Sequence, residues 1–137
     1  MKGLFTCFDA SRQYTEPTRK YAGDAGYDLY SPVDALLSPF HVQHVKTNVR
    51  MHLPPGWFAL MQERSSQGLA GVFTLGNVGD EGYEGEIGVS LLNVTRETKI
   101  VHAGDRIAQL VLIPRFIDPE EHLLPSRGGK GFGSSGR

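Results

Sequence analysis

The sequence contains a single cysteine, Cys7, among its 137 residues. One cysteine can form neither an internal disulfide nor a cysteine zinc cluster. The chain also lacks any apolar run approaching the ~20 residues that a membrane-spanning helix requires, and its first residues hold no apolar stretch of signal-peptide length. These absences predict a cytoplasmic protein, or one of the host cytoplasm if the source is a virus, with no membrane partner.

The charge is nearly balanced, with 14 basic residues against 15 acidic ones and a net charge of −1. Such a chain has no global attraction for nucleic acid or for anionic lipid surfaces. A phosphate-bearing ligand would therefore have to be held by local donors. This favours a small nucleotide over a polymer and predicts no nucleic-acid partner.

Long helices are hard to place because 17 glycines and 8 prolines interrupt the chain throughout. The runs between them are short and rich in β-branched and aromatic residues, which predicts strands over residues 4–8, 41–49, 57–62, 71–75, 86–94 and 106–113. One short helix is predicted over SSQGLA, with Ser65 or Ser66 as its N-cap. The length and this pattern predict a single all-β domain of the sandwich, jelly-roll or barrel type.

Two of the predicted strands have features of their own. In the run from residue 41 to 49, the apolar alternation is imperfect, as in a half-buried strand with a local irregularity. The run IAQLVLI is apolar on both faces except at Gln109, which predicts a strand sandwiched in the core. Because a buried amide needs partners, Gln109 is predicted to bond neighbouring backbone.

The composition changes at Pro125, where the tail PSRGGKGFGSSGR begins. We therefore predict a β domain over residues 1–124 and a flexible arm over 125–137. A glycine-rich tail cannot build a packed core, so it is either a frayed end, which composition alone favours, or a lid that orders over a ligand. For a lid, Arg127 supplies charge, Phe132 a stacking face and Ser134 a donor.

Two earlier segments combine glycine or hydroxyl residues with charged side chains. Asp28 in AGDAGYDLYS is either a solvated acid at a turn, which the residue alone favours, or a carboxylate in a metal's outer shell. Arg64, followed by Ser65 and Ser66 at a predicted helix start, makes either a compact anion site or an ordinary helix cap. The two interpretations are equally supported.

Two later segments place acids next to glycines. Asp80 and Tyr83 lie in a predicted glycine-rich hairpin, where an acid either solvates the turn or acts as a general base toward water. Gly104 and Asp105 are predicted to form a turn into the strand that contains Gln109. None of these segments decides the function alone.

Taken in order, the segments resemble the five motifs of the trimeric dUTPase family: AGDAGYDLYS, ERSS, GDEGYEGEI, AGDRIAQLVL and SRGGKGFGSSG. The match runs from about residue 22 to residue 136, and five motifs in the right order are far more specific than any one. The resemblance implies a distorted jelly-roll-like β-barrel that assembles as a homotrimer with shared active sites. The tail of one chain would close the site of another.

The resemblance implies Mg²⁺-dependent hydrolysis of dUTP to dUMP and pyrophosphate by attack of water on the α-phosphorus. This activity limits uracil incorporation into DNA and supplies dUMP for thymidylate synthesis. By resemblance, Asp80 activates the water, Asp28 holds Mg²⁺ through water, and Tyr83 packs under the deoxyribose and excludes UTP. By resemblance, Phe132 would stack on uracil. The remaining substrate-binding residues implied are Arg64, Ser65, Ser66, Gln109, Arg127, Gly133 and Ser134.

The sequence departs from the family pattern at two positions. Gly79 stands before Asp80 where a bulky aliphatic residue is usual, which we expect to loosen the loop. Glu63 stands before Arg64 where proline or glycine is usual, which we expect to place a negative charge near the phosphates. The alternatives are a dCTP deaminase-like or bifunctional enzyme, disfavoured because the position of its catalytic glutamate is Ser90, and a dUTPase-fold module that binds a regulatory protein partner.

Overall fold

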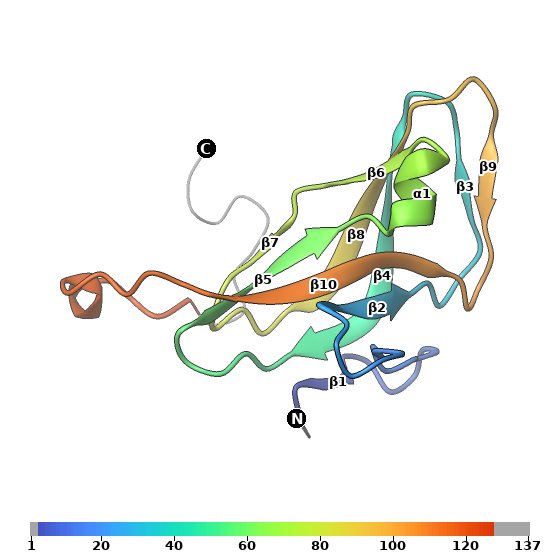
Figure 1. Cartoon of the computed structure of the whole chain (residues 1–137). Coiled ribbons are helices and arrows are strands. Elements are labelled where there is room, and N and C mark those ends of the chain that lie inside the picture. Colours follow the sequence, from blue (N-terminus) through green and yellow to red (C-terminus); the bar gives the residue numbers. More distant parts are fainter. Residues whose placement is uncertain (1–2, 128–137) are drawn as a thin grey trace.

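The computed structural model describes residues 3–127, and nearly all of its regular structure is β-strand (Figure 1). One sheet has the order β1-β4-β8-β6, formed by Phe5–Cys7, Val42–Met51, Glu86–Asn93 and Val72–Leu75. A second has the order β2-β10-β5-β7, formed by Gly26–Tyr30, Arg106–Pro114, Trp57–Gln62 and Val78–Gly79. β3 (Ala35–Leu37) pairs with β9 (Lys99–Val101), and the helical pieces are α1 (Ser65–Leu69) and the 3-10 turn η1 (Glu121–Leu123). The predicted all-β fold is confirmed.

The core is built from the inward faces of the two four-stranded sheets. β8 shows the strict alternation expected of a strand with one buried face, because Ile87, Val89 and Leu91 are buried while their neighbours are not. β2, β5 and β10 contribute Leu29, Ala59 and Leu110 from the other side. Each fully buried valine, leucine or isoleucine side chain stabilises the fold by about 2 kcal/mol.

The longer strands lie close to their predicted bounds. β5 covers the predicted range, and β10 pairs on both sides, with β2 and with β5, as a strand inside the core should. Only the first half of β10 is buried, since Val111 to Ile113 are half-exposed. The strands β3, β7 and β9 have three residues or fewer and were not predicted; β1 is as short, but the run LFTCF around it is apolar and aromatic enough to be recognised.

The predicted irregularity in β4 is a bulge at Asn48. The pairing with β8 shifts register between Lys46 and Val49, and Asn48 has a φ of 63° with no exposed surface. Its amide Nδ2 donates to the carbonyls of Asp9, Arg12 and Gln13 at 3.0, 3.1 and 3.0 Å. The Asn48 side chain therefore holds the loop that follows β1 in place.

Replacing Asn48 with alanine should lower the free energy of unfolding by about 3 kcal/mol, because several buried polar groups lose their partners and alanine tolerates a positive φ poorly. Gln43→Ala, on the exposed part of the same strand, is the matched control and should change it by less than about 0.5 kcal/mol. Urea unfolding at one protein concentration measures both. Equal stabilities of the two variants would show that the bulge network contributes little.

After Pro114 the chain leaves the sheets. Figure 1 shows residues 115–124 running away from the body of the domain to η1. The segment exposes apolar side chains: Phe116 is 82% exposed, Leu123 71% and Leu124 71%. Within residues 3–127, no helix has the length and apolar character needed to cross a membrane.

The division of the chain after residue 124 remains a prediction. Phe132, Gly133 and Ser134 lie outside the described residues.

Candidate active site

Asp28 lies in the middle of β2, where two arginines approach its carboxylate. Arg64 Nε is 3.6 Å from Oδ1, and Arg106 Nη1 is 3.6 Å from Oδ2. The Asp28 side chain is only 21% exposed, so the solvated acid that the residue alone favoured is wrong. These separations are ion pairs that are too long for good hydrogen bonds. Both guanidinium groups therefore keep donors available for another anion.

Gln109 lies directly opposite Asp28 in the pairing of β10 with β2. Its Nε2 donates to the carbonyl of Glu63 at 3.2 Å, which confirms the predicted bond to backbone. The side chain lies across Gly26, and a Cβ at that position would collide with the Gln109 amide. Gly26 in the first motif thus leaves the room that Gln109 occupies.

Arg64 is the N-cap residue of the one-turn helix α1, and no side chain caps it. The predicted capping by Ser65 or Ser66 is therefore wrong. Both serines are exposed, and neither hydroxyl has a hydrogen-bond partner within residues 3–127. Their donors remain available beside the arginine.

The carboxylate of Glu63 is bonded to β6. Thr74 on β6 donates to it from its backbone N at 3.1 Å and from its hydroxyl at 3.0 Å. These hydrogen bonds hold the pKa of Glu63 below its ordinary value. Thr74 of β6 therefore holds the Glu63 carboxylate, and the expectation that its charge lies near the phosphates remains a prediction.

The loop 80–85 crosses from one sheet to the other. β7 pairs with β5, whereas β8 pairs with β4 and β6, so the predicted hairpin is wrong. Gly79 lies against β5, where a Cβ would come within 3.2 Å of both Ala59 Cβ and Met51 Cε. Glycine at this position therefore allows close packing of β7 on β5, and its expected effect on the loop remains a prediction.

Asp80 is the most exposed acid of the candidate site, with 52% of its side chain accessible. Arg127 Nη2 lies 2.9 Å from its Oδ2 within the same chain. Arg127, predicted to contact phosphate, is thus placed on Asp80 in this structure. A half-exposed pair of this kind contributes little to stability, so either partner can exchange for a ligand.

Tyr83 lies across the same loop with its ring half-buried against the core. Its hydroxyl donates to the carbonyl of Glu86 at 3.0 Å, and burial, together with the charge of Glu86, raises the pKa of Tyr83. A Cβ on Gly85 would overlap the ring. Gly85 therefore leaves the room in which the Tyr83 ring packs against the core.

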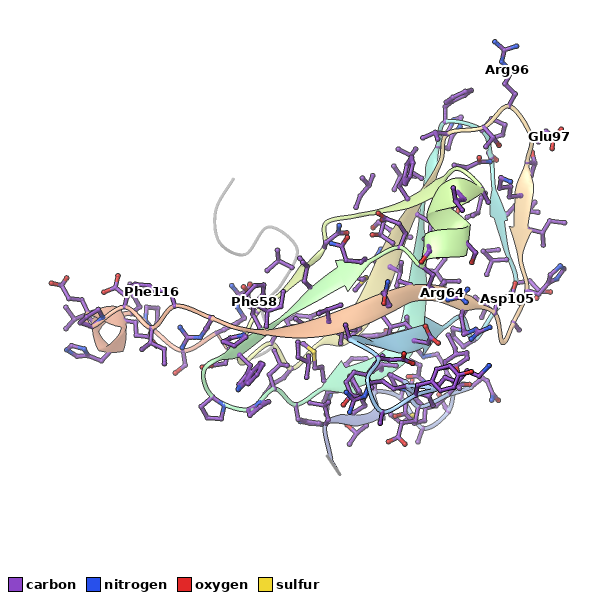
Figure 2. The ribbon with its side chains drawn as sticks, in the orientation of Figure 1. Phe58, Arg64, Arg96, Glu97, Asp105 and Phe116 are labelled. Atoms are coloured by element: carbon purple, nitrogen blue, oxygen red, sulfur yellow. The ribbon has the colours of Figure 1, made fainter. Side chains whose placement is uncertain are left out.

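The two halves of the site lie at opposite ends of β5. Figure 2 shows Phe58 at one end of this strand and Arg64 just past the other. Gly79 pairs with Ala59, and Gln109 pairs with Gln62. Those positions on β5 are about 10 Å apart at the usual rise of an extended strand. Asp80 and Arg64 lie further apart still, since each extends beyond its end of the strand.

Comparison with known proteins decides the family, since the family model for dUTPase matches residues 12–136. The chain belongs to the dUTPase family. It is 42% identical over 125 residues to the deoxyuridine 5'-triphosphate nucleotidohydrolase of cowpox virus, covering 88% of this chain and 84% of the relative. It is 47% identical over 126 residues to the protein of that name in Bifidobacterium longum, covering 85% and 78% of the two chains.

A solved dUTPase structure shares the fold over almost the whole chain. A variant of the dUTPase of Staphylococcus bacteriophage 80alpha, with dUpNHpp, superposes with a TM-score of 0.75 at 25% identity and covers 97% of each chain. The predicted family, fold class and enzyme class, that of a dUTP diphosphatase, are confirmed.

Arg106 is the member of this dUTPase-family site that sequence reasoning missed. It stands in the fourth motif beside Asp105, but only the pairing of β10 with β2 brings it to Asp28. A register shift between Arg106 and Ala108 moves it relative to the rest of the strand. Simple alternation along β10 could not have placed it.

Proposed function

We propose that this dUTPase-family chain hydrolyses dUTP to dUMP and pyrophosphate at a site to which at least two copies contribute. The relatives described above are named for this activity, and the phage enzyme was solved with dUpNHpp. The observation that carries the proposal is the separation of the Asp28–Arg64 cluster from Asp80 along β5. The Asp28–Arg64 cluster is suited to bind the phosphates and Asp80 to activate water, and hydrolysis needs both.

The cluster at the Arg64 end is suited to bind a triphosphate. Arg64 and Arg106 offer planar donor groups, which match phosphate oxygens well. Ser65 and Ser66 add exposed hydroxyls without partners within residues 3–127, and Gln109 adds an amide held between Gly26 and Glu63. Together they can neutralise and orient the phosphates without a basic surface.

Asp28 fits a magnesium ion that arrives with the substrate. Within residues 3–127, no group of three or more His, Cys, Asp or Glu side chains could hold a metal alone. Mg²⁺ keeps several waters and is held by one or two carboxylates together with the substrate's phosphates. Asp28 supplies one such carboxylate beside the phosphate-binding residues. Bound there, the ion supplies charge neutralisation on the phosphates. The water-mediated contact remains a prediction.

Asp80 is proposed as the general base that activates the attacking water. A base must lie within about 3 Å of the group it deprotonates, and the Arg64 cluster of the same chain is too far away. The other acids in the loop are less suitable. The carboxylate of Glu81 is already bound by Arg115. Within residues 3–127, Glu84 is bonded only through its backbone carbonyl, which accepts from Arg50, so no contact orients its carboxylate. The Asp80 of one copy therefore serves the phosphate-binding residues of another.

The exposed apolar side chains after β10 support this assembly. Phe116, Leu123 and Leu124 would be unfavourably solvated on an isolated chain and fit an interface between subunits. We propose the homotrimer that the family resemblance predicts, with Arg127 released from Asp80 to bind phosphate when substrate enters. A regulatory protein partner stays an untested prediction.

No observation favours the deaminase alternative. Ser90 lies on β8 with its hydroxyl 3.0 Å from Nδ1 of His44, so no carboxylate occupies the position that a deaminase requires. Incubating the purified protein with Mg²⁺ and dUTP, dCTP, UTP or dTTP, and identifying the products, tests the proposal. Pyrophosphate from dUTP alone is expected. Ammonia from dCTP, or equal hydrolysis of all four nucleotides, would overturn it.

Tyr83→Ala should raise the ratio of UTP to dUTP hydrolysis about tenfold, because removing the ring opens space for a 2′-hydroxyl. Tyr83→Phe keeps the ring, loses only the bond to Glu86, and should keep the ratio of the parent protein. For each variant, UTP and dUTP hydrolysis are measured on the same preparation, so their ratio does not depend on the fraction of protein that is folded. An unchanged ratio in Tyr83→Ala would place sugar discrimination elsewhere.

A further inference from the structure

Arg115, the first residue after β10, joins two carboxylates from different parts of the chain. Its Nε and Nη2 lie 3.1 and 3.3 Å from the two carboxylate oxygens of Glu81. Its Nη1 and Nη2 lie 2.9 and 2.8 Å from those of Glu121 in η1. Both contacts are bidentate, the geometry in which arginine holds a carboxylate most firmly.

The Glu81 end of this arrangement is adjacent in sequence to Asp80. The backbone N of Gly56 donates to Glu81 Oε1, and the backbone N of Arg115 donates to the carbonyl of Gly56 at 2.9 Å. The turn before β5, the end of β10 and the loop 80–85 therefore meet at one carboxylate. These bonds keep the pKa of Glu81 below its ordinary value, so the contact persists at neutral pH.

Asp80 itself has no comparable anchor. It is 52% exposed, and within residues 3–127 its carboxylate makes a single ion pair, with Arg127. On the far side of the loop, Arg50 Nε donates to the carbonyl of Glu84 at 2.9 Å. The direction of Asp80 is thus set by the backbone on either side of it, and Glu81 is the nearer support.

We infer that Arg115 is a positioning residue for Asp80. By clamping Glu81 it fixes the start of the loop 80–85, and by clamping Glu121 it ties that loop to the segment that leaves the domain. The inference rests on the proposed role of Asp80 as the base. Its consequence is that Arg115 acts on the rate of the chemical step and not on substrate affinity, because it touches none of the phosphate-binding residues.

A purely structural role for Arg115 makes a different prediction. If the arginine only anchors residues 116–124, then removing Glu121 should harm activity as much as removing Glu81. If it positions Asp80, the two carboxylates differ, because Glu121→Gln leaves the bidentate Arg115–Glu81 contact intact. Glu81→Gln removes it while leaving Arg115 bound to Glu121.

The test compares Arg115→Gln, Arg115→Lys, Glu81→Gln and Glu121→Gln in the full chain with Mg²⁺ and dUTP. A displacement of a catalytic group by about 1 Å can cost up to about 100-fold, so Arg115→Gln and Glu81→Gln should each lower kcat at least about tenfold with KM within about twofold. Glu121→Gln should stay within about threefold of the parent kcat. Arg115→Lys keeps the positive charge but not the bidentate guanidinium, so its kcat should lie between those of Arg115→Gln and the parent protein.

The same substitutions in an Asp80→Asn background separate the two proposals. With the base removed, Arg115→Gln should lower the residual kcat no further, whereas a general loss of structure would lower it again. If Asp80→Asn retains turnover, the proposed base is wrong. If Asp80→Asn is inactive but Arg115→Gln and Glu81→Gln keep the parent kcat, only the inference fails.

Glu121→Gln reproducing the full loss would also overturn the inference. Thermal unfolding and solution mass are measured for every variant. Should Arg115→Gln fail to fold or assemble, Glu81→Gln decides the question by the same criteria.

Discussion

Asp80→Asn is expected to lower kcat for dUTP by about 10³-fold while leaving substrate bound, because the amide cannot accept the proton of the attacking water. The fold should be unaffected: the substitution removes one exposed ion pair, with Arg127, and no buried contact. Steady-state hydrolysis gives kcat, and equilibrium binding of a non-hydrolysable dUTP analogue gives affinity. A fall in turnover without a fall in binding identifies a group that acts on the transition state.

Glu84→Gln is the matched control for this experiment. Glu84 lies in the same loop and is exposed, and only its backbone carbonyl takes part in a hydrogen bond within the described residues. It should hydrolyse dUTP within about threefold of the parent rate. Turnover by Asp80→Asn within about tenfold of the parent, or a larger loss in Glu84→Gln, would remove Asp80 from the mechanism.

The sequence predicted the long strands well because periodicity is a local property. β5 and β8 carry enough residues for alternation and β-branched content to identify them, and the bulge at Asn48 was visible as a break in that alternation. The pairing of strands is not local. The loop 80–85 looks like a hairpin because it is rich in glycine, yet β7 and β8 belong to different sheets.

The site was predicted residue by residue from resemblance, but its geometry was not. The residue alone favoured a solvated Asp28, and only the fold shows that Arg64, at the start of α1, and Arg106, on β10, reach its carboxylate. Glu63 was expected to place a negative charge near the phosphates, and only the fold shows that Thr74 binds its carboxylate. In each case the deciding partner is distant in sequence, so no local pattern contains it.

The proposed division of the site between copies predicts the second large effect. Arg64→Ala and Asp80→Asn should each be nearly inactive alone, by about 10²- to 10³-fold. If the two are mixed in equal amounts, unfolded and refolded together, activity should return. In a symmetric assembly of randomly mixed chains, about a quarter of the sites take Arg64 from one variant and Asp80 from the other, and so are intact.

Two mixtures that cannot form an intact site serve as controls. Arg64→Ala with Gln109→Ala should not recover, because these side chains belong to one cluster within a chain and every such cluster then carries a defect. Asp80→Asn with the Arg64→Ala/Asp80→Asn double variant should not recover either, since no copy carries the base. If the mixture of Arg64→Ala with Asp80→Asn stays as inactive as its parts although its chains have exchanged, as mass measurement of tagged subunits would show, both groups must come from one chain. The separation along β5 would then have to close by movement within a single copy, and the shared site would be wrong.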